Sequence, residues 1–244
     1  MRDIDTTLFS NGYDSASIEK DDLKIINQLL KSSNIHKDGP NTVRLEKDFQ
    51  AYLGMNHAFA FSKGRHALAA ILSALQLDNG DEVILPGYTC VVVPNSISYN
   101  GLKPVYCDIE LDTFGPSLES IKKLVTRKTK VIIAQHTYGL VCRDYEDILS
   151  FAKKNNIYII DDCAQATGAM YKNKKLGYFA TASFYSLQHS KIITCGDGGI
   201  AATNDDSIAK KIKAIQKKLK YLVQLGQIIL KNYQTALLFW QFTN

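Results

Sequence analysis

Lys191 is the residue of this sequence best placed to act as a reagent. It stands in SLQHSKIITCGDGG (186–199), among small, polar and apolar residues, whereas most other lysines lie in pairs or beside charged residues. A lysine amine has an ordinary pKa of about 10.4, and burial lowers that pKa toward a range where the amine is a useful nucleophile. Taken alone, the position leaves two interpretations open, a reactive amine or a lysine that extends from a loop into water.

Two acids follow the apolar residues 157–160. The segment IIDDCAQA places Asp161 and Asp162 where an unpaired carboxylate would be costly to bury. Two interpretations stay open on spacing alone. Either the acids cap a helix start, whose positive end stabilises them, or a carboxylate faces a buried cation.

A glycine-bearing turn completes the set. In FSKGRHAL (61–68), Gly64 follows a short apolar segment and opens a helix, and backbone N–H groups at such a helix start can bind a phosphate. A lysine, a buried acid and a phosphate-binding helix start are the three contacts that pyridoxal phosphate requires. The lysine would form a Schiff base with the cofactor aldehyde, and the acid would keep the pyridine nitrogen protonated.

The elements that must position these residues alternate between strand and helix patterns. Such alternation predicts a three-layer α/β fold, with a mostly parallel sheet covered by helices on both faces. Strands are expected at residues 82–86, 103–109, 130–136, 157–163, 182–187 and 199–204, and helices at 17–32, 42–53, 65–75, 118–125 and 145–155.

Ligands of parallel sheets bind beyond the carboxyl ends of the strands. The strand ends to inspect are therefore residues 87–90, 136–139, 161–165 and 186–191. Because Asp162 and Lys191 lie in two of these segments, we expect them to share one site.

Composition describes an ordinary globular chain of 244 residues, with 45% hydrophobic and 22% charged residues. Its five cysteines are far apart, which suits a reducing cytoplasm better than a disulfide framework or a metal site. The N-terminal residues lack the apolar region of a secretory signal, and no run of 18 apolar residues occurs. A cytoplasmic protein is expected.

The net charge of +5 comes from one terminal segment. Residues 209–244 contain seven lysines and no acid, so the preceding residues carry a net charge of −2. A nucleic-acid-binding protein would spread its cations over a binding face, so we expect no nucleic-acid partner.

The ordered motifs resemble the DegT/DnrJ/StrS family of sugar aminotransferases, which are pyridoxal phosphate enzymes of fold type I. The resemblance runs from about Asn34 to Asp206. GLKPVYCDIELDTF is similar to the family's G-A-K-P-V-F-V-D-I-D-P-D-T, IIAQHTYGL to its H-x-Y-G segment, and FSKGRHALAAILSAL to its S-G-T-A-A-L phosphate turn. The segment from IIDDCAQATG to the lysine is similar to the family's E-D-A-A-Q-A-x-G segment, and GDGGIAATNDD to its E-G-G-M-V-V-T-N-D.

The resemblance implies a role for each of several residues. Lys191 would be the Schiff-base lysine, which also moves the proton between the substrate α-carbon and the cofactor C4′. Asp162 would contact the pyridine nitrogen and Gln165 the ring oxygen. The other implied positions are Gly64, Arg65 and Ser186 at the phosphate, Tyr88 or Cys90 near the ring face, and His136 in the substrate pocket.

The same resemblance implies amination of a nucleotide-linked keto-sugar in amino-sugar or surface polysaccharide biosynthesis. Glutamate would be the amino donor, and the active site would form between the subunits of a homodimer. One alternative is a sugar dehydratase of the family, whose members usually carry His at the lysine position; His189 is two residues away. The other alternative is a noncatalytic remnant.

The sequence departs from the family pattern in several places. Arg65 stands where a Thr is usual, Cys90 where a large aromatic is common, and Asp161 where Glu is usual. A guanidinium can also hold a phosphate, so Arg65 either binds it or turns to solvent.

The end of the chain differs most. We expect an N-terminal helical segment (1–40), a cofactor-binding large domain (41–208) and a basic, then apolar, helical tail (209–244), truncated before the family's small C-terminal domain. A truncated chain, a split gene and a decayed copy would look alike. The tail is interpreted either as a helix that lacks its packing partner or as an amphipathic helix with weak contact to a membrane surface.

Overall fold

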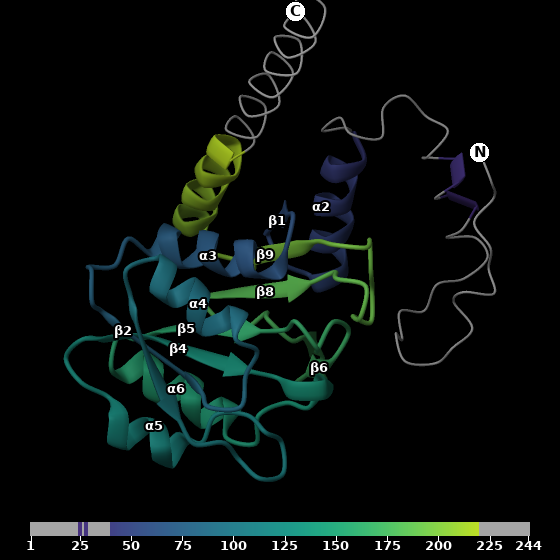
Figure 1. The fold of residues 1–244 in the computed structure, drawn as a ribbon. Helices are drawn as coiled ribbons and strands as arrows, with labels where there is room; N and C mark the ends of the chain where they lie inside the picture. Colours follow the sequence, from purple (N-terminus) through teal and green to yellow (C-terminus); the bar gives the residue numbers. More distant parts are fainter. Residues whose placement is uncertain (1–23, 26, 29–39, 220–244) are drawn as a thin grey trace, which may run out of the picture.

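The computed structural model describes residues 24, 25, 27, 28 and 40–219. Most of the helix expected at 17–32, and residues 220–244 of the expected tail, lie outside this described part. Within it, seven strands form one sheet in the order β1-β9-β8-β5-β4-β2-β3 (Figure 1). The strands are β1 (His57–Phe61), β2 (Glu82–Pro86), β3 (Lys103–Cys107), β4 (Thr129–Gln135), β5 (Tyr158–Asp162), β8 (Ala182–Ser186) and β9 (Gly199–Thr203).

The sheet is mostly parallel. Only β9 runs antiparallel to its neighbours, β1 and β8. The central strands β8, β5, β4 and β2 pair in parallel, so their carboxyl ends meet at one edge of the sheet. The α/β class with a mostly parallel sheet is confirmed.

Helices cover both faces of this sheet (Figure 1). Side chains of α2, α5 and α6 pack into one apolar core, and those of α3, α4 and a helix at 206–219 pack into the other. The bounds are α2 (Pro40–Leu53), α3 (Gly64–Leu75), α4 (Val92–Tyr99), α5 (Leu118–Leu124) and α6 (Tyr145–Lys154). A 3-10 turn, η2 (Thr137–Gly139), and a small hairpin of β6 (Met170–Tyr171) and β7 (Lys174–Lys175) complete the described elements.

Burial explains why continuous apolar runs became strands. All five residues of β2, of β8 and of β9 are buried, because helices cover the sheet on both sides. In α3, Leu68, Ile71 and Leu72 are nearly inaccessible, and each contributes about 1.5–3 kcal/mol by leaving water. This packing holds the start of α3 against the edge of the sheet where β8 ends.

The sequence did not predict the turn η2, the hairpin of β6 and β7, or two longer elements, β1 and α4. The segment HAFAF forms β1 at the edge of the sheet, and VVPNSISY forms α4. In α4, the two valines and Pro94 disfavour the prediction of a helix from the sequence. Proline is nevertheless tolerated in the first helical turn, where Pro94 lies. Both segments obtain their stability from packing on neighbours that are distant in sequence.

The described part of the expected tail packs against the large domain. Ala209 and Ile212 are buried in the core beside α3, and Gln216 donates a hydrogen bond to Glu46 of α2 at 2.6 Å. The proposed boundaries at residues 40 and 208 stay predictions, as does any membrane-surface contact of the tail. Among the described helices, none is long and apolar enough to cross a membrane.

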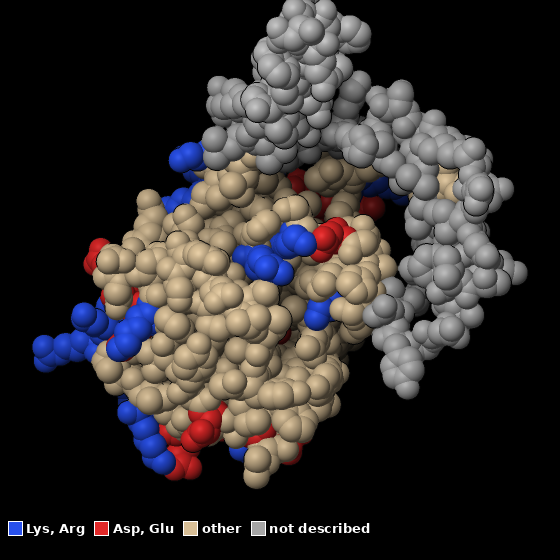
Figure 2. All heavy atoms as spheres, in the orientation of Figure 1, with Lys and Arg blue, Asp and Glu red and all other residues tan. Residues whose placement is uncertain are grey.

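Charged side chains are scattered on the face seen in Figure 2. Lys and Arg lie there among uncharged residues and close to Asp and Glu, rather than in one continuous basic field. This distribution gives that face no resemblance to a phosphate-backbone binding surface.

Candidate active site

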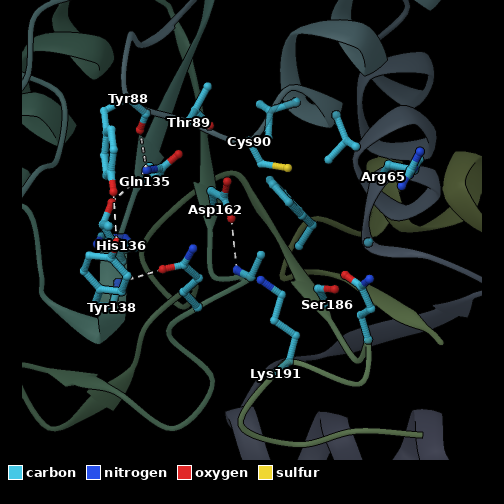
Figure 3. A pocket seen from close by; sticks show the side chains of 18 residues that line it. Arg65, Tyr88, Thr89, Cys90, Gln135, His136, Tyr138, Asp162, Ser186 and Lys191 are labelled. Atoms are coloured by element: carbon cyan, nitrogen blue, oxygen red, sulfur yellow. Dashed lines mark hydrogen bonds between the residues drawn. The ribbon is translucent and has the colours of Figure 1, made fainter. Parts of the chain in front are cut away.

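A pocket of about 290 Å³ opens at the carboxyl ends of the central strands (Figure 3). Residues that follow β2, β4, β5 and β8 line it, together with the start of α3. This is the position at which parallel sheets bind ligands. The eight residues of the predicted site all line this pocket, and Cys90 does so as well.

Asp162 is the acid of this pocket. It ends β5, is buried, and accepts a hydrogen bond from the Ala164 N–H through Oδ1 at 2.9 Å. Burial raises the pKa of its carboxyl to about 6, although the Ala164 hydrogen bond and the charges of His136 and Lys191 oppose that rise. The acid therefore caps the turn after β5 and also faces the pocket, so the two interpretations of the sequence are compatible.

Lys191 lies across the same pocket. It is half-buried in the loop after β8, and its backbone N–H donates to Gln188 O at 2.9 Å. The loop is closed by a hydrogen bond from the Leu187 N–H to Gly198 O at 2.9 Å. Figure 3 shows the Lys191 side chain extending into the cavity toward Asp162, so the amine and the carboxylate share one cavity.

The start of α3 forms the opposite end of the pocket. A Cβ on Gly64 would lie 3.1 Å from the Ser186 Cβ, so glycine permits close approach of the helix start to the end of β8. Lys63, at the N-cap, makes no side-chain capping hydrogen bond. Backbone N–H groups and the Ser186 hydroxyl thus lie together at the positive end of a helix, an arrangement suited to an anion.

Cations reinforce this end. Arg65 is exposed, lines the pocket, and makes no ion pair within the described residues. Partial burial, followed by the charges of Arg65 and Lys63, lowers the pKa of His66. Asp197 pairs with Lys63 at 2.7 Å and partly offsets this positive charge.

Two exposed tyrosines form the rim. The hydroxyls of Tyr88 and Tyr138 lie 2.9 Å apart, and Tyr138 has the left-handed backbone conformation (φ 55°) that few non-glycine residues adopt. Gln165 accepts a hydrogen bond from the Tyr138 N–H through Oε1 at 3.1 Å. Its Nε2 makes no hydrogen bond inside the described ranges, so Gln165 can offer a donor to a ligand oxygen.

Sequence reasoning missed several lining residues. Thr89 Oγ1 is buried without a hydrogen-bond partner in the described part of the chain, and Gln135 donates to the Tyr88 carbonyl at 2.9 Å. Thr89 and Tyr138 do lie in the strand-end segments selected from the sequence. Nothing in the sequence, however, distinguished them from neighbours that turn away.

His136 reaches the pocket from a fully buried position. Its Nε2 lies 3.4 Å from Asp161 Oδ1, and its ring meets the Tyr145 ring edge-on at 4.9 Å between centroids. Among the residues that the structure describes, no group of three or more His, Cys, Asp or Glu side chains could hold a metal ion. The pocket instead joins an amine, an acid and an anion-binding helix start.

Comparison with known proteins agrees with this geometry. Residues 16–221 match the DegT/DnrJ/EryC1/StrS aminotransferase family, and the chain belongs to that family. One curated relative, the GDP-perosamine synthase of Caulobacter vibrioides, is 37% identical over 189 residues, which are 78% of this chain and 51% of that protein. The chain spans about half the length of the curated relatives that it matches.

Solved structures share the fold. An aminotransferase from Psychrobacter cryohalolentis matches with a TM-score of 0.76 and 33% identity, over 81% of this chain and 50% of that one. A GDP-4-keto-6-deoxymannose-3-dehydratase with a trapped PLP-glutamate geminal diamine matches with a TM-score of 0.75 and 26% identity, over 81% and 52% of the two chains. The solved structures of this fold therefore include both an aminotransferase and a dehydratase.

Proposed function

We propose that this chain is the cofactor-binding part of a pyridoxal phosphate-dependent aminotransferase that acts on a nucleotide-linked keto-sugar. The observation that carries the proposal is the shared pocket of Lys191 and Asp162, whose far end is the uncapped start of α3. These groups match the three parts of pyridoxal phosphate, which are an aldehyde, a basic ring nitrogen and a phosphate.

The donor set fits the cofactor. The Lys191 amine would hold it covalently, Asp162 would accept the hydrogen bond of the protonated ring nitrogen, and the Gln165 Nε2 would donate to the ring oxygen. The helix start, with Gly64, Arg65 and Ser186, would hold the phosphate, and Tyr88 and Cys90 would lie near the ring. Bound pyridoxal phosphate supplies a heterocycle that withdraws electrons from a substrate C–H bond.

Asp162 is suited to keep the ring nitrogen protonated. Its pKa of about 6 leaves it ionised at neutral pH, where burial makes a cationic partner favourable. A charge-assisted hydrogen bond of this kind contributes about 1.5–3 kcal/mol. The Lys191 amine, once free, would carry the proton between the substrate α-carbon and the cofactor C4′ as a general acid and base.

The substrate class follows from the relatives. GDP-perosamine synthase carries a nucleotide sugar in its name, and the dehydratase structure holds a PLP–glutamate adduct. We infer a nucleotide-linked keto-sugar as acceptor, glutamate as amino donor, and a homodimer that completes the site. His136 would line the sugar side of the pocket.

Absorbance tests the covalent link. Purified protein with pyridoxal phosphate should give the visible band of the lysine-bound cofactor, and borohydride should fix the cofactor mass on the peptide that contains Lys191. Lys191→Ala should abolish both signals, while Lys130→Ala, which alters a half-buried lysine of β4 bonded to Arg127 O, should keep them. A wild-type chain without the band, or a label on another peptide, would refute the proposal and favour a noncatalytic remnant.

Dehydration is the second candidate, since a dehydratase shares the fold. Those relatives usually carry His at the lysine position. Here Lys191 lines the pocket and the exposed His189 does not. Product analysis distinguishes the two reactions, because amination transfers nitrogen from labelled glutamate to the sugar and dehydration leaves the sugar without it.

A further inference from the structure

Two buried polar atoms face each other beneath the pocket. His136 Nε2 and Asp161 Oδ1 lie 3.4 Å apart, and both side chains are 0% exposed. Neither atom has another hydrogen-bond partner among the described residues. A buried polar atom left unpaired costs about 1–3 kcal/mol, so such atoms in folded proteins nearly always have a partner.

The other oxygen of Asp161 is firmly held. Its Oδ2 accepts a hydrogen bond from the Tyr145 hydroxyl at 2.5 Å and another from the Gly177 N–H at 3.1 Å. Two donors on one oxygen fix the orientation of the carboxyl group. Oδ1 is therefore an acceptor that points at the imidazole.

The other nitrogen of His136 has only a weak contact. Nδ1 lies 3.7 Å from the Cys142 Sγ, whose S–H donates to the Gln135 carbonyl at 3.1 Å. Sulfur is a poor acceptor. A proton on Nε2 satisfies two buried atoms at once, whereas a proton on Nδ1 alone would leave two acceptors facing each other.

The remaining titratable neighbours stay neutral. Burial raises the pKa values of the Cys142 and Cys163 thiols and of the Tyr145 and Tyr185 hydroxyls well above their ordinary values, and the charge of Asp161 adds to each rise. The groups that can carry charge around His136 are thus Asp161 below it and, toward the pocket, Asp162 and Lys191.

We propose that Asp161 and His136 form a buried hydrogen-bonded pair, with the proton on His136 Nε2, which fixes the pocket wall beside Asp162. Successive residues of a strand face opposite sides of a sheet, so Asp161 and Asp162 are separated by the sheet itself. His136 spans that separation, because its ring contacts Asp161 while its backbone N–H donates to Asp162 O at 3.1 Å.

The consequence for the site rests on the proposed function. With its Nε2 proton directed at Asp161, His136 does not donate to the Asp162 carboxylate, which stays available to the ring nitrogen of the cofactor. Asp161, Tyr145 and His136 are positioning residues in this scheme. They act through Asp162 and not on the cofactor.

Imidazole ¹⁵N NMR of the cofactor-free protein tests the pair directly. The wild-type spectrum should show His136 protonated on Nε2, with its signals assigned by their loss in His136→Gln. In Asp161→Asn, the Tyr145 hydroxyl and the Gly177 N–H retain the amide oxygen, so the amide NH₂ faces Nε2. The His136 proton should then move to Nδ1. A wild-type His136 with a bare Nε2, or an identical His136 spectrum in both proteins, would overturn the pair.

A milder variant and a control guard against misfolding. Tyr145→Phe keeps the ring beside His136 and removes one donor to Asp161, so it should shift the His136 signals without switching the proton. Glu46→Gln alters another buried carboxylate, which accepts from the Ala60 N–H at 2.9 Å outside the pocket, and should leave the His136 signals unchanged. Equal changes in all three variants would contradict a specific pair.

Cofactor titration tests the positioning role separately. Asp161→Asn should weaken pyridoxal phosphate binding about tenfold and shift the pH at which the bound cofactor's absorbance changes, since the carboxylate acceptor that orients His136 beside Asp162 is replaced by an amide donor. Glu46→Gln should do neither. Failure of the wild-type protein to bind the cofactor would count against the proposed function, whereas the NMR result decides whether the pair exists. If the NMR result is as expected but cofactor titration of Asp161→Asn matches that of the wild type, the positioning role is rejected.

Discussion

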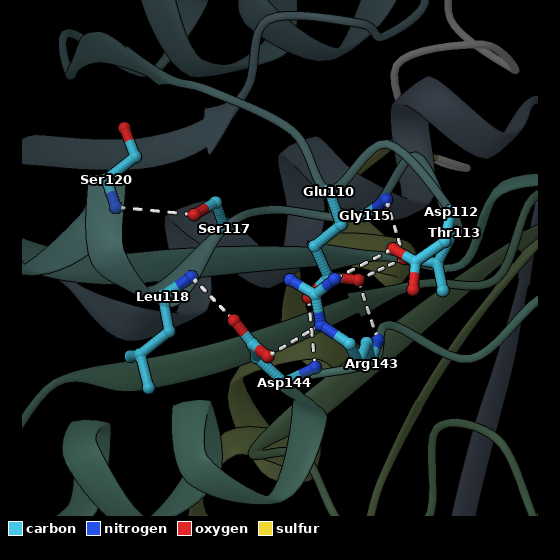
Figure 4. A network of polar contacts seen from close by, with 9 residues as sticks. All are labelled: Glu110, Asp112, Thr113, Gly115, Ser117, Leu118, Ser120, Arg143 and Asp144. Atoms are coloured by element: carbon cyan, nitrogen blue, oxygen red, sulfur yellow. Dashed lines mark hydrogen bonds and ion pairs between the residues drawn. The ribbon is translucent and has the colours of Figure 1, made fainter.

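The buried acid Glu110 and the buried pair Asp161 and Asp162 differ in how fully their carboxylate oxygens are hydrogen-bonded. Glu110, after β3, uses both carboxylate oxygens: Oε1 accepts from the Asp144 N–H at 2.9 Å, and Oε2 accepts from the Arg143 N–H at 2.7 Å and from the Thr113 hydroxyl (Figure 4). Under the pocket, and counting only partners in the described part of the chain, Asp161 leaves Oδ1 without an ordinary hydrogen bond, and the Asp162 carboxylate accepts from one N–H.

The difference separates structural acids from site acids. The Glu110 network joins the loop 108–117 to the start of α6, and the Arg143 side chain extends it to Asp112 at 3.1 Å. Every buried lone pair used there stabilises the fold. At the pocket, burial raises the pKa of Asp162, and its carboxylate would be available to the proposed cofactor.

The largest expected effect on cofactor binding comes from Asp162. Asp162→Asn should weaken pyridoxal phosphate binding, and slow the spectral change on adding glutamate, by about a hundredfold each, because a buried charge-assisted hydrogen bond is lost. Titration and stopped-flow absorbance measure both. Glu110→Gln should change neither, and a comparable loss in that variant would remove the distinction between the two groups.

Glu110→Ala should instead lower the free energy of unfolding by about 4 kcal/mol, because two backbone N–H groups and a hydroxyl lose their acceptor. Urea unfolding monitored by circular dichroism measures the change. Glu119→Ala removes an exposed acid paired with Lys123 at 2.6 Å and should leave the free energy of unfolding nearly unchanged. An equal decrease in the free energy of unfolding in the two variants would show that the buried Glu110 network stabilises the fold no more than an exposed ion pair does.

Asp162 should also destabilise the cofactor-free fold in a pH-dependent way. The folded state binds the carboxyl proton more tightly, because the pKa rises from 3.8 to about 6. The free energy of unfolding therefore falls as pH rises from about 4 to about 6, and the full penalty of about 3 kcal/mol is present above pH 6. Asp162→Asn should recover it at pH 7 and be neutral near pH 4. Thermal unfolding measured across this pH range tests the effect. A gain in stability of Asp162→Asn that is the same at every pH would contradict the raised pKa of Asp162.

The smallest effect is expected at the phosphate end. Gly64→Ala places a methyl group 3.1 Å from the Ser186 Cβ and should weaken binding of inorganic phosphate and of the cofactor about tenfold, by displacing the helix start. Gly80→Ala is the matched control. Its φ is 83°, with no atom within 4 Å of the added Cβ, so it should reduce stability without altering binding. Calorimetric titration measures both affinities. Unchanged affinity in Gly64→Ala would be evidence against this phosphate site.

Much of the fold was readable because its signals are local. The apolar run EVILP and the helix pattern ending at Leu75 depend on neighbours in sequence, and both elements formed within a residue of the expected bounds. β1 and α4 were missed since their stability comes from distant packing partners. The site residues were selected from strand ends and family motifs, and their proposed roles await the experiments above.

The chain by itself determined which groups are present and at which strand ends they lie, since strand and turn preferences act over a few residues. Only the tertiary structure decided which groups meet. The sheet order places β8, β5, β4 and β2 side by side, so Lys191, Asp162 and His136, which are far apart in sequence, come to one edge. That strand order, together with packing from both faces, also brings His136 against Asp161 and Gly64 close to Ser186. No short stretch of sequence encodes these contacts.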